Sequence, residues 1–176
     1  TIAAGKATST QIGTDTLISI ENVTGSSGNN VIVASDAANT INGAAGNDVI
    51  AATVDDVADS FDGGAGNDTA DYSSYTAALT VTLNGATYVN VSGSGTGLDQ
   101  IRNFENFTGG SGDDVITGNG SANTLNGGVG IDTLNGGTGN DTLNGGDGGD
   151  TLNGGGNNDR LIGGIGNDNM DGGTGY

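Results

Sequence analysis

The chain contains no cysteine, histidine, proline or tryptophan, and the missing residue types exclude several kinds of chemistry. Without cysteine there are no disulfides and no thiolate chemistry. Without histidine, the usual transition-metal ligand and the usual general base at neutral pH are absent. Basic residues are almost as scarce, since only Lys6, Arg102 and Arg160 stand against 21 acidic residues. A basic patch therefore cannot form, which excludes nucleic acid and anionic membrane surfaces as partners.

The chain also lacks any apolar run long enough to span a membrane, so membrane insertion is not expected. Aromatic residues make up only 4% of it, and the net charge is -18. A chain of this composition is either disordered or ordered by bound cations. It begins at Thr1 rather than at a methionine and ends within a repeat, so we expect it to be part of a longer protein.

What the chain has instead is glycine, 37 residues of it, arranged with a period of nine. From Gly109 onward, a glycine opens each block, an acidic residue or asparagine stands at its sixth position, and a large apolar residue follows two positions later. The sixth-position residues are Asp114, Asn123, Asp132, Asp141, Asp150, Asp159 and Asp168. A low-complexity linker has no need of an apolar residue in a fixed frame, so the pattern indicates an ordered solenoid.

The period also predicts how the blocks stack. The glycine-rich half of each block is expected to form a tight turn, and the next three residues a short strand with its leucine pointing inward. Two blocks then make one turn of eighteen residues, so that Asp132 stacks on Asp114 and Asp150. Stacked carboxylates repel one another unless a cation lies between them. Carboxylates and turn carbonyls together form an all-oxygen site, which suits calcium better than magnesium.

A weaker form of the repeat precedes this block, and a longer repeat overlies both. Residues 21–50 match residues 105–134 at an offset of 84 residues, which indicates a tandem module duplication. We divide the chain into the end of a preceding module or spacer strands (1–24), a first repeat block (25–71), spacer strands (72–108) and a second repeat block (109–176). In the spacer, Asn84-Gly85 between alternating apolar residues favours a hairpin, although residues 78–91 can equally continue the solenoid.

The blocks resemble the RTX (repeats-in-toxin, hemolysin-type) nonapeptide GGxGxDxUx, in which U is a large apolar residue. GGTGNDTLN (136–144) and GGIGNDNMD (163–171) fit the pattern at every defined position. The resemblance implies an all-β fold, a parallel β-roll with several calcium ions between stacked glycine-rich turns. It also implies export from a bacterial cell through a type I system.

The resemblance further implies which residues bind calcium. The side-chain ligands would be the sixth-position aspartates, with Asp59 filling that place in an eleven-residue block: Asp48, Asp59, Asp68, Asp114, Asp132, Asp141, Asp150, Asp159 and Asp168. Backbone carbonyls of the first and third positions would complete the sites: Gly63, Ala65, Gly127, Val129, Gly136, Thr138, Gly145, Asp147, Gly154 and Gly156. Sites built on Asn30, Asn39 or Asn123 are expected to be weaker, because each lacks one negative ligand.

These expectations define two functional hypotheses. The first is a calcium-binding structural or spacer segment of a large secreted or cell-surface protein, such as an adhesin, surface layer or matrix fibre, with possible surface, matrix or self-association contacts. The second is an accessory roll that aids the export and folding of a secreted enzyme such as a protease, lipase or epimerase. The tandem modules favour the first, because repetition sets length. Catalysis within the chain is not expected, because no nucleophile–base pair can be assembled.

Overall fold

The computed structural model describes residues 7–8 and 21–175, which form strands and turns without a helix. This part of the chain therefore contains no helix suited to crossing a membrane. The strands are β1 (Ala7–Thr8), β2 (Asn22–Thr24), β3 (Val31–Val33), β4 (Thr40–Asn42), β5 (Val49–Ala51), β6 (Ser60–Asp62), β7 (Thr69–Asp71), β8 (Thr80–Thr82), β9 (Val89–Asn90), β10 (Gln100–Arg102), β11 (Asn106–Thr108), β12 (Val115–Thr117), β13 (Thr124–Val129), β14 (Thr133–Thr138), β15 (Thr142–Asp147), β16 (Thr151–Gly156), β17 (Arg160–Ile165) and β18 (Asn169–Asp171).

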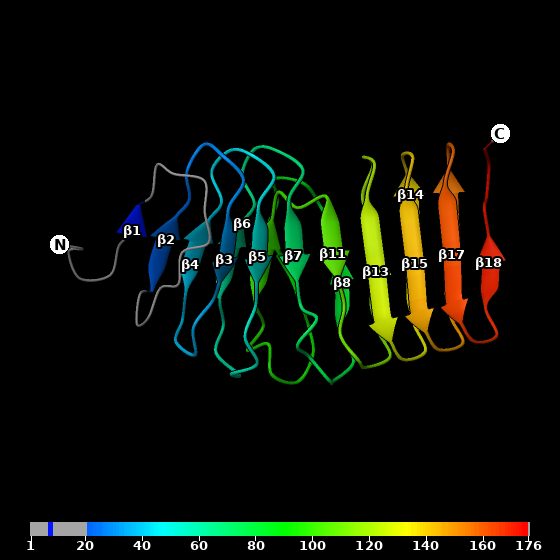
Figure 1. Ribbon diagram of the computed structural model, residues 1–176, viewed down its shortest axis with the longest axis horizontal. Coiled ribbons are helices and arrows are strands. Elements are labelled where there is room, and N and C mark those ends of the chain that lie inside the picture. The colour runs from blue at the N-terminus through cyan, green and yellow to red at the C-terminus, as the bar shows by residue number, and fades with distance from the viewer. Residues whose placement is uncertain (1–6, 9–20, 176) are drawn as a thin grey trace.

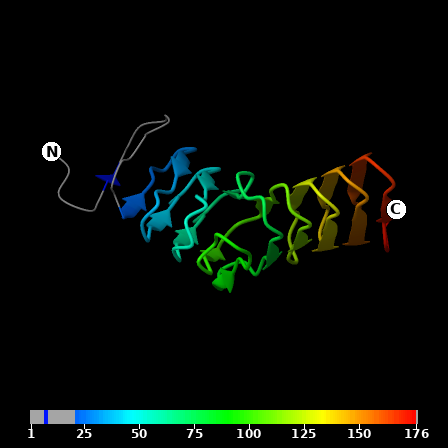
Figure 2. The same ribbon diagram turned by 90° about the horizontal axis from the view of Figure 1, so that it is seen from below.

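The strands stack into two walls of a solenoid (Figures 1 and 2). One wall is a seven-stranded sheet in the order β17-β15-β13-β11-β7-β5-β3. The other consists of a six-stranded sheet, β1-β2-β4-β6-β10-β9, and a five-stranded sheet, β18-β16-β14-β12-β8. Neighbouring strands are parallel except where β9 pairs with β10. The predicted all-β parallel β-roll is confirmed.

The register of the walls follows the period of the sequence. On one wall Leu125 pairs with Leu143, and Leu143 pairs with Leu161. On the other wall Ile116 pairs with Leu134 in the same way. Each of these steps is eighteen residues, so two blocks form one turn, as predicted.

The core contains a column of apolar side chains, one from the second residue of most strands, to which Tyr72, Tyr75, Leu79 and Phe104 are added near the spacer. Leu125, Leu134 and Leu143 are each 0% exposed, whereas the neighbouring Asn135 and Asn144 are only partly buried. This alternation follows from strand geometry, which sends successive side chains to opposite faces. Burial of each leucine contributes roughly 1.5–3 kcal/mol.

Strand length differs from the prediction in the second repeat block. Three-residue strands were expected throughout, but β13 to β17 each span six residues, because the Gly-Gly pair extends the ladder. Gly128 and Gly146 pair across β13 and β15, and both have a φ of 111°. A side chain on Gly146 would overlap the Gly128 carbonyl oxygen. Only glycine therefore permits backbones to stack at this place.

The spacer both forms a hairpin and continues the solenoid. β8 pairs in parallel with β12, so it occupies a regular place in its wall. Beyond β9 the chain returns antiparallel to β8, and Thr80 and Ser92 exchange two backbone hydrogen bonds of 2.8 and 3.0 Å. The turn is closed by a hydrogen bond from the Thr87 N–H to the Asn84 carbonyl, with Gly85 at a φ of 50°. The spacer thereby connects the two sheets of one wall.

Candidate metal centre

The sixth-position aspartates form a ladder of hydrogen bonds between turns. The Asp114 N–H donates to Asp132 Oδ1 at 2.7 Å, and the Asp132 N–H donates to Asp150 Oδ1 at 2.8 Å. The Asp150 N–H continues the series to Asp168 Oδ1 at 3.0 Å. The same contact recurs along the other wall. Each aspartate thus uses one carboxylate oxygen to fix the turn that precedes it.

The second oxygen of most of these aspartates is buried and has no hydrogen-bond partner. A buried carboxylate oxygen without a partner is costly, and in native proteins it indicates a missing ion or water. The Oδ2 atoms in this state belong to Asp48, Asp59, Asp68, Asp132, Asp141, Asp150 and Asp159. They are seven of the nine aspartates that the sequence predicted as side-chain ligands.

Glycine at the first position of most blocks lets the backbone approach these oxygens closely. A methyl group built on Gly127 would lie 2.7 Å from both the Asp132 carboxyl carbon and the carbonyl oxygen of Gly145 in the next turn. The space beside Gly136 is bordered in the same way by Asp141 and by the Gly154 carbonyl oxygen. Each gap between turns therefore presents a carboxylate oxygen and a backbone carbonyl oxygen. The first-position carbonyls predicted as ligands border such gaps: Gly63, Gly127, Gly136, Gly145 and Gly154.

The third-position carbonyls are engaged in the backbone ladder. The Ala65 carbonyl accepts the Gly46 N–H at 3.0 Å, and the Asp147 carbonyl accepts the Gly130 N–H at 2.8 Å. The Gly156 carbonyl accepts the Gly139 N–H in the same manner, and Val129 and Thr138 lie in paired strands. A carbonyl oxygen has a second lone pair, so this engagement leaves one free to meet an ion.

Burial makes the charged form of these carboxylates unfavourable. It raises the pKa of Asp59 to about 7 and that of Asp68 to about 6, in both cases against backbone hydrogen bonds that lower the pKa. Burial also raises the pKa of Asp132 to about 6, and the charges of Asp114 and Asp150 raise it further. A bound divalent cation would offset both the desolvation and the mutual repulsion.

Where asparagine stands at the sixth position, its side-chain oxygen accepts a hydrogen bond from a backbone N–H of its own turn. The Asn123 side-chain oxygen accepts the Asn119 N–H at 2.8 Å, and its Nδ2 donates to the Glu105 carbonyl at 2.7 Å. Asn30 and Asn39 likewise accept an N–H from their own turns, at 2.7 and 2.6 Å. The prediction that these sites are weaker is consistent with this geometry, since the amide oxygen of each asparagine has a hydrogen-bond donor within its own turn.

Asp114 differs from the other aspartates in a way that the sequence did not reveal. Its Oδ1 accepts the Leu79 N–H at 2.7 Å, and its Oδ2 accepts the Gly110 N–H at 2.9 Å. Neither oxygen is without a partner. Asp114 and Asp132 were both predicted as ligands, whereas the structure leaves only Asp132 of this pair with an unpartnered oxygen.

The sequence argument missed two acidic residues that occupy sixth-position places. Asp99 accepts the Asp59 N–H at 2.9 Å through Oδ1 and the Tyr72 hydroxyl at 2.9 Å through Oδ2. Glu105 accepts the Asp68 N–H at 2.9 Å. Asp99 carries a detectable signal, because Ile101 follows it two residues later as in the repeat. Glu105 carries the same signal in Phe107, but its turn has lost the glycine-rich pattern.

The eleven-residue block places its extra residues in a loop packed against the spacer. The Asp55 and Asp56 N–H groups donate to the Gly95 carbonyl, and Asp56 Oδ1 accepts the Gly95 N–H at 2.9 Å. Asp55 accepts hydrogen bonds from the Val57 N–H and the Thr53 hydroxyl. Both carboxylates thus have protein partners, while Asp59 takes the sixth-position place.

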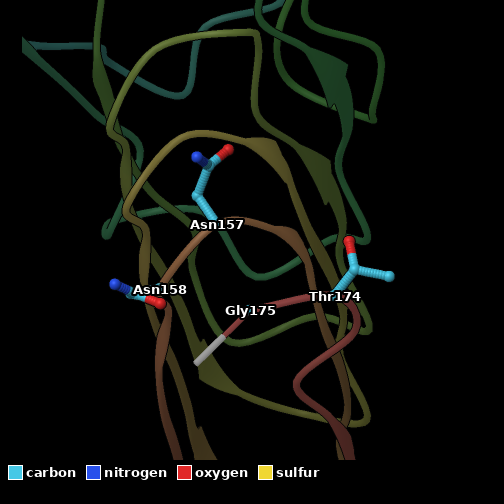
Figure 3. Close-up of a pocket in the computed structure, with 4 residues that line it drawn as sticks. All are labelled: Asn157, Asn158, Thr174 and Gly175. Carbon is cyan, nitrogen blue, oxygen red and sulfur yellow. The ribbon is translucent and has the colours of Figure 1, made fainter.

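Side chains alone do not make a metal site in the part of the chain that the structure describes. No group of three or more acidic side chains there is placed to hold an ion. A pocket at the last turn is lined by Asn157, Asn158, Thr174 and Gly175, none of which carries a carboxylate (Figure 3). Any ion must therefore sit between turns and take backbone carbonyls as well as carboxylates.

The comparison with family models agrees with this geometry. The model described as the RTX calcium-binding nonapeptide repeat matches residues 24–56, 58–70, 104–134, 128–161 and 144–176, which is more than half of the chain. The chain belongs to this family. A search of curated proteins gave no match.

The residues of this RTX chain fit calcium. Its gaps offer hard oxygen donors, from carboxylates and carbonyls, which are the ligands that calcium takes in groups of six to eight. The unpartnered Oδ2 atoms lie where such an ion is needed. A calcium ion, with its charge of +2, would lie between stacked aspartates and replace their mutual repulsion by attraction of both carboxylates to the ion.

Proposed function

We propose that this RTX chain is a calcium-dependent structural spacer of a large secreted bacterial protein, with no catalytic role of its own. The observation that carries the proposal is the set of seven buried aspartate oxygens without partners, repeated along both walls. The stacking of the turns along one axis, with β2 near one end and β18 at the other, supports a role in setting length (Figure 1).

Calcium binding also supplies a reason for where the chain folds. Extracellular calcium modules bind at about 10⁻⁴–10⁻³ M, so such sites stay empty in a low-calcium cytosol. With empty sites, the stacked carboxylates oppose folding and leave the chain extended for export. Outside the cell the sites fill, and the binding free energy becomes folding free energy.

Circular dichroism of the whole chain, in chelator and in millimolar calcium, tests this proposal. We expect a weak β signal in chelator, a strong one in calcium, and little effect of magnesium, which prefers strict octahedral geometry. A strong β signal in chelator that calcium leaves unchanged would contradict the proposal. Measuring calcium bound per chain by equilibrium dialysis separates binding from folding.

A further inference from the structure

The turn between β10 and β11 is shorter than its neighbours in the stack. Asn103, Phe104 and Glu105 make the connection that residues 63–68 make in the turn before it. Asn103 has a φ of 54°, which tightens the reversal, and Phe104 is buried at 1% exposure. The shortened turn has no aspartate and no glycine, so no repeat pattern marks it as a binding site.

Glu105 nevertheless makes the contact of a sixth-position aspartate. Its Oε2 accepts the Asp68 N–H at 2.9 Å, just as Asp68 Oδ1 accepts the Asp48 N–H at 2.7 Å. The glutamate side chain is one methylene longer than aspartate. The register of β11 against β7, in which Asn106 pairs with Thr69, places Glu105 opposite Asp68.

The gap beside Glu105 has the same donors as the regular gaps. Asp68 is 0% exposed, and its Oδ2 has no hydrogen-bond partner. A methyl group built on Gly63 would overlap the Asn103 carbonyl oxygen and lie 2.9 Å from Asp68 Oδ2. Asn103 thus takes the place of the first-position glycine carbonyl, and Glu105 that of the next carboxylate.

The guanidinium of Arg102 does not neutralise the negative charges of Asp68 and Glu105. Arg102 donates to Asp62 Oδ2 at 2.7 and 3.0 Å, and it lies 4.5 Å from the centre of the Tyr88 ring. Asn103 Nδ2 also donates to Asp62, at 2.7 Å. The basic residue is therefore committed to Asp62. The negative charges of Asp68 and Glu105 need a cation from solution.

We propose that Glu105 is a calcium ligand at the junction of the two repeat blocks, in a site shared with Asp68 and the Asn103 carbonyl. The proposal rests on the calcium-binding function proposed above. On this wall the site carries calcium binding beyond the first block into the spacer. On the other wall Asp99 stands beside Asp59 in the same way, but its Oδ2 accepts the Tyr72 hydroxyl, and Leu79 stands at the next sixth position.

Glu105→Gln tests the ligand role without removing the structural contact, since glutamine keeps an oxygen that accepts the Asp68 N–H. We expect the variant to fold in saturating calcium, by circular dichroism, but to bind one calcium ion fewer per chain by equilibrium dialysis and metal analysis. Asp68→Asn should lose this ion as well, and it also removes a carboxylate from the neighbouring Asp48 gap. The double variant should lose no more than Asp68→Asn alone, because Glu105 and Asp68 hold the same ion.

Glu21→Gln is the matched control, because Glu21 has the same place in the first copy of the motif but is exposed. It should bind as many ions as the unaltered chain. The proposal is overturned if Glu105→Gln binds the full number, if the double variant loses more ions than Asp68→Asn alone, or if Glu21→Gln loses one as well. Failure of the unaltered chain to bind any calcium would instead overturn the proposed function itself.

Discussion

At the scale of single residues, one atom separates an unpartnered carboxylate oxygen, the proposed calcium ligand, from a contact that is satisfied within the protein. An aspartate at the sixth position offers Oδ1 to the preceding turn and leaves Oδ2 unpartnered, as at Asp132. Asn123 instead turns its oxygen to its own turn and donates from Nδ2 to the Glu105 carbonyl. The choice between the two residue types therefore sets which gaps need an ion and which are closed by the protein.

Asn123→Asp should add a calcium site at a cost to the calcium-free fold. The change removes the amide donor to a carbonyl, a loss of about 1–3 kcal/mol, and adds a negative charge beside that carbonyl. In the presence of calcium the new carboxylate becomes a ligand, so the chain should bind calcium more tightly or bind one more calcium ion. Equilibrium dialysis and thermal unfolding, each with and without calcium, check the two opposite effects. Unchanged binding would show that residue 123 does not border an ion gap.

At the scale of elements, most strands place one apolar side chain in the core, at their second residue, with outward side chains on either side of it. Such a strand is too short to hold its place alone, so its stability comes from its neighbours in the wall. The leucines are stacked eighteen residues apart in register, which makes the core a column one side chain wide. If a leucine is replaced by a smaller residue, the cavity left in that column is surrounded by few atoms that can move to fill it.

Leu143→Ala should destabilise the calcium-loaded chain by about 2–5 kcal/mol, the usual range for a large-to-small change in a core. Asn144→Ala is the matched control on the same strand. It removes a partly buried hydrogen bond from Asn144 Nδ2 to Asn126 Oδ1 at 3.0 Å, worth about 1 kcal/mol. Denaturant unfolding in saturating calcium compares the two. Equal losses would mean that the strand does not face the core as described.

At the scale of the whole molecule, buried carboxylates decide when the solenoid is stable. The pKa of Asp59 is raised by burial to about 7, and the pKa values of Asp68, Asp99 and Asp132 are raised mainly by burial to about 6. All start from an ordinary value of 3.8. The folded state therefore holds these protons more tightly than the unfolded state.

In chelator, the fold should become more stable as the pH falls from about 7 towards about 4. Above pH 7 these carboxylates are ionised in both states, and their burial opposes folding in full. As the pH falls through the folded-state pKa values, they become protonated in the folded state first, and the opposition is lost. Circular dichroism of the chelated chain at pH 8 and pH 5 should show more β structure at pH 5.

Two variants separate this effect from the loss of net charge alone. Asp59→Asn should reduce the gain at low pH, because it removes a buried carboxyl with a raised pKa. Asp171→Asn removes an exposed carboxyl and should leave most of the gain in place. A chelated chain that loses structure as the pH falls from 8 to 5 would contradict the assignment of burial as the cause.

The sequence by itself determined the parts of this protein that repeat. A period of nine with one apolar residue and one aspartate specifies a short strand, a tight turn and a stack of eighteen residues per turn. Those features depend on residues close together in the chain or one turn apart. The fold class and the family therefore followed from the spacing of residues such as Leu134 and Asp132.

The tertiary structure alone decided the contacts across the spacer, which join residues 35 to 40 positions apart. It paired Glu105 with Asp68 and placed the Tyr72 hydroxyl so that it donates to Asp99. It also supplied both carboxylate oxygens of Asp114 with backbone N–H donors. It also placed β2 and β11, which are 84 residues apart in the sequence, on opposite walls. No local pattern encodes these outcomes, because an irregular connection, rather than the period, sets which turns meet.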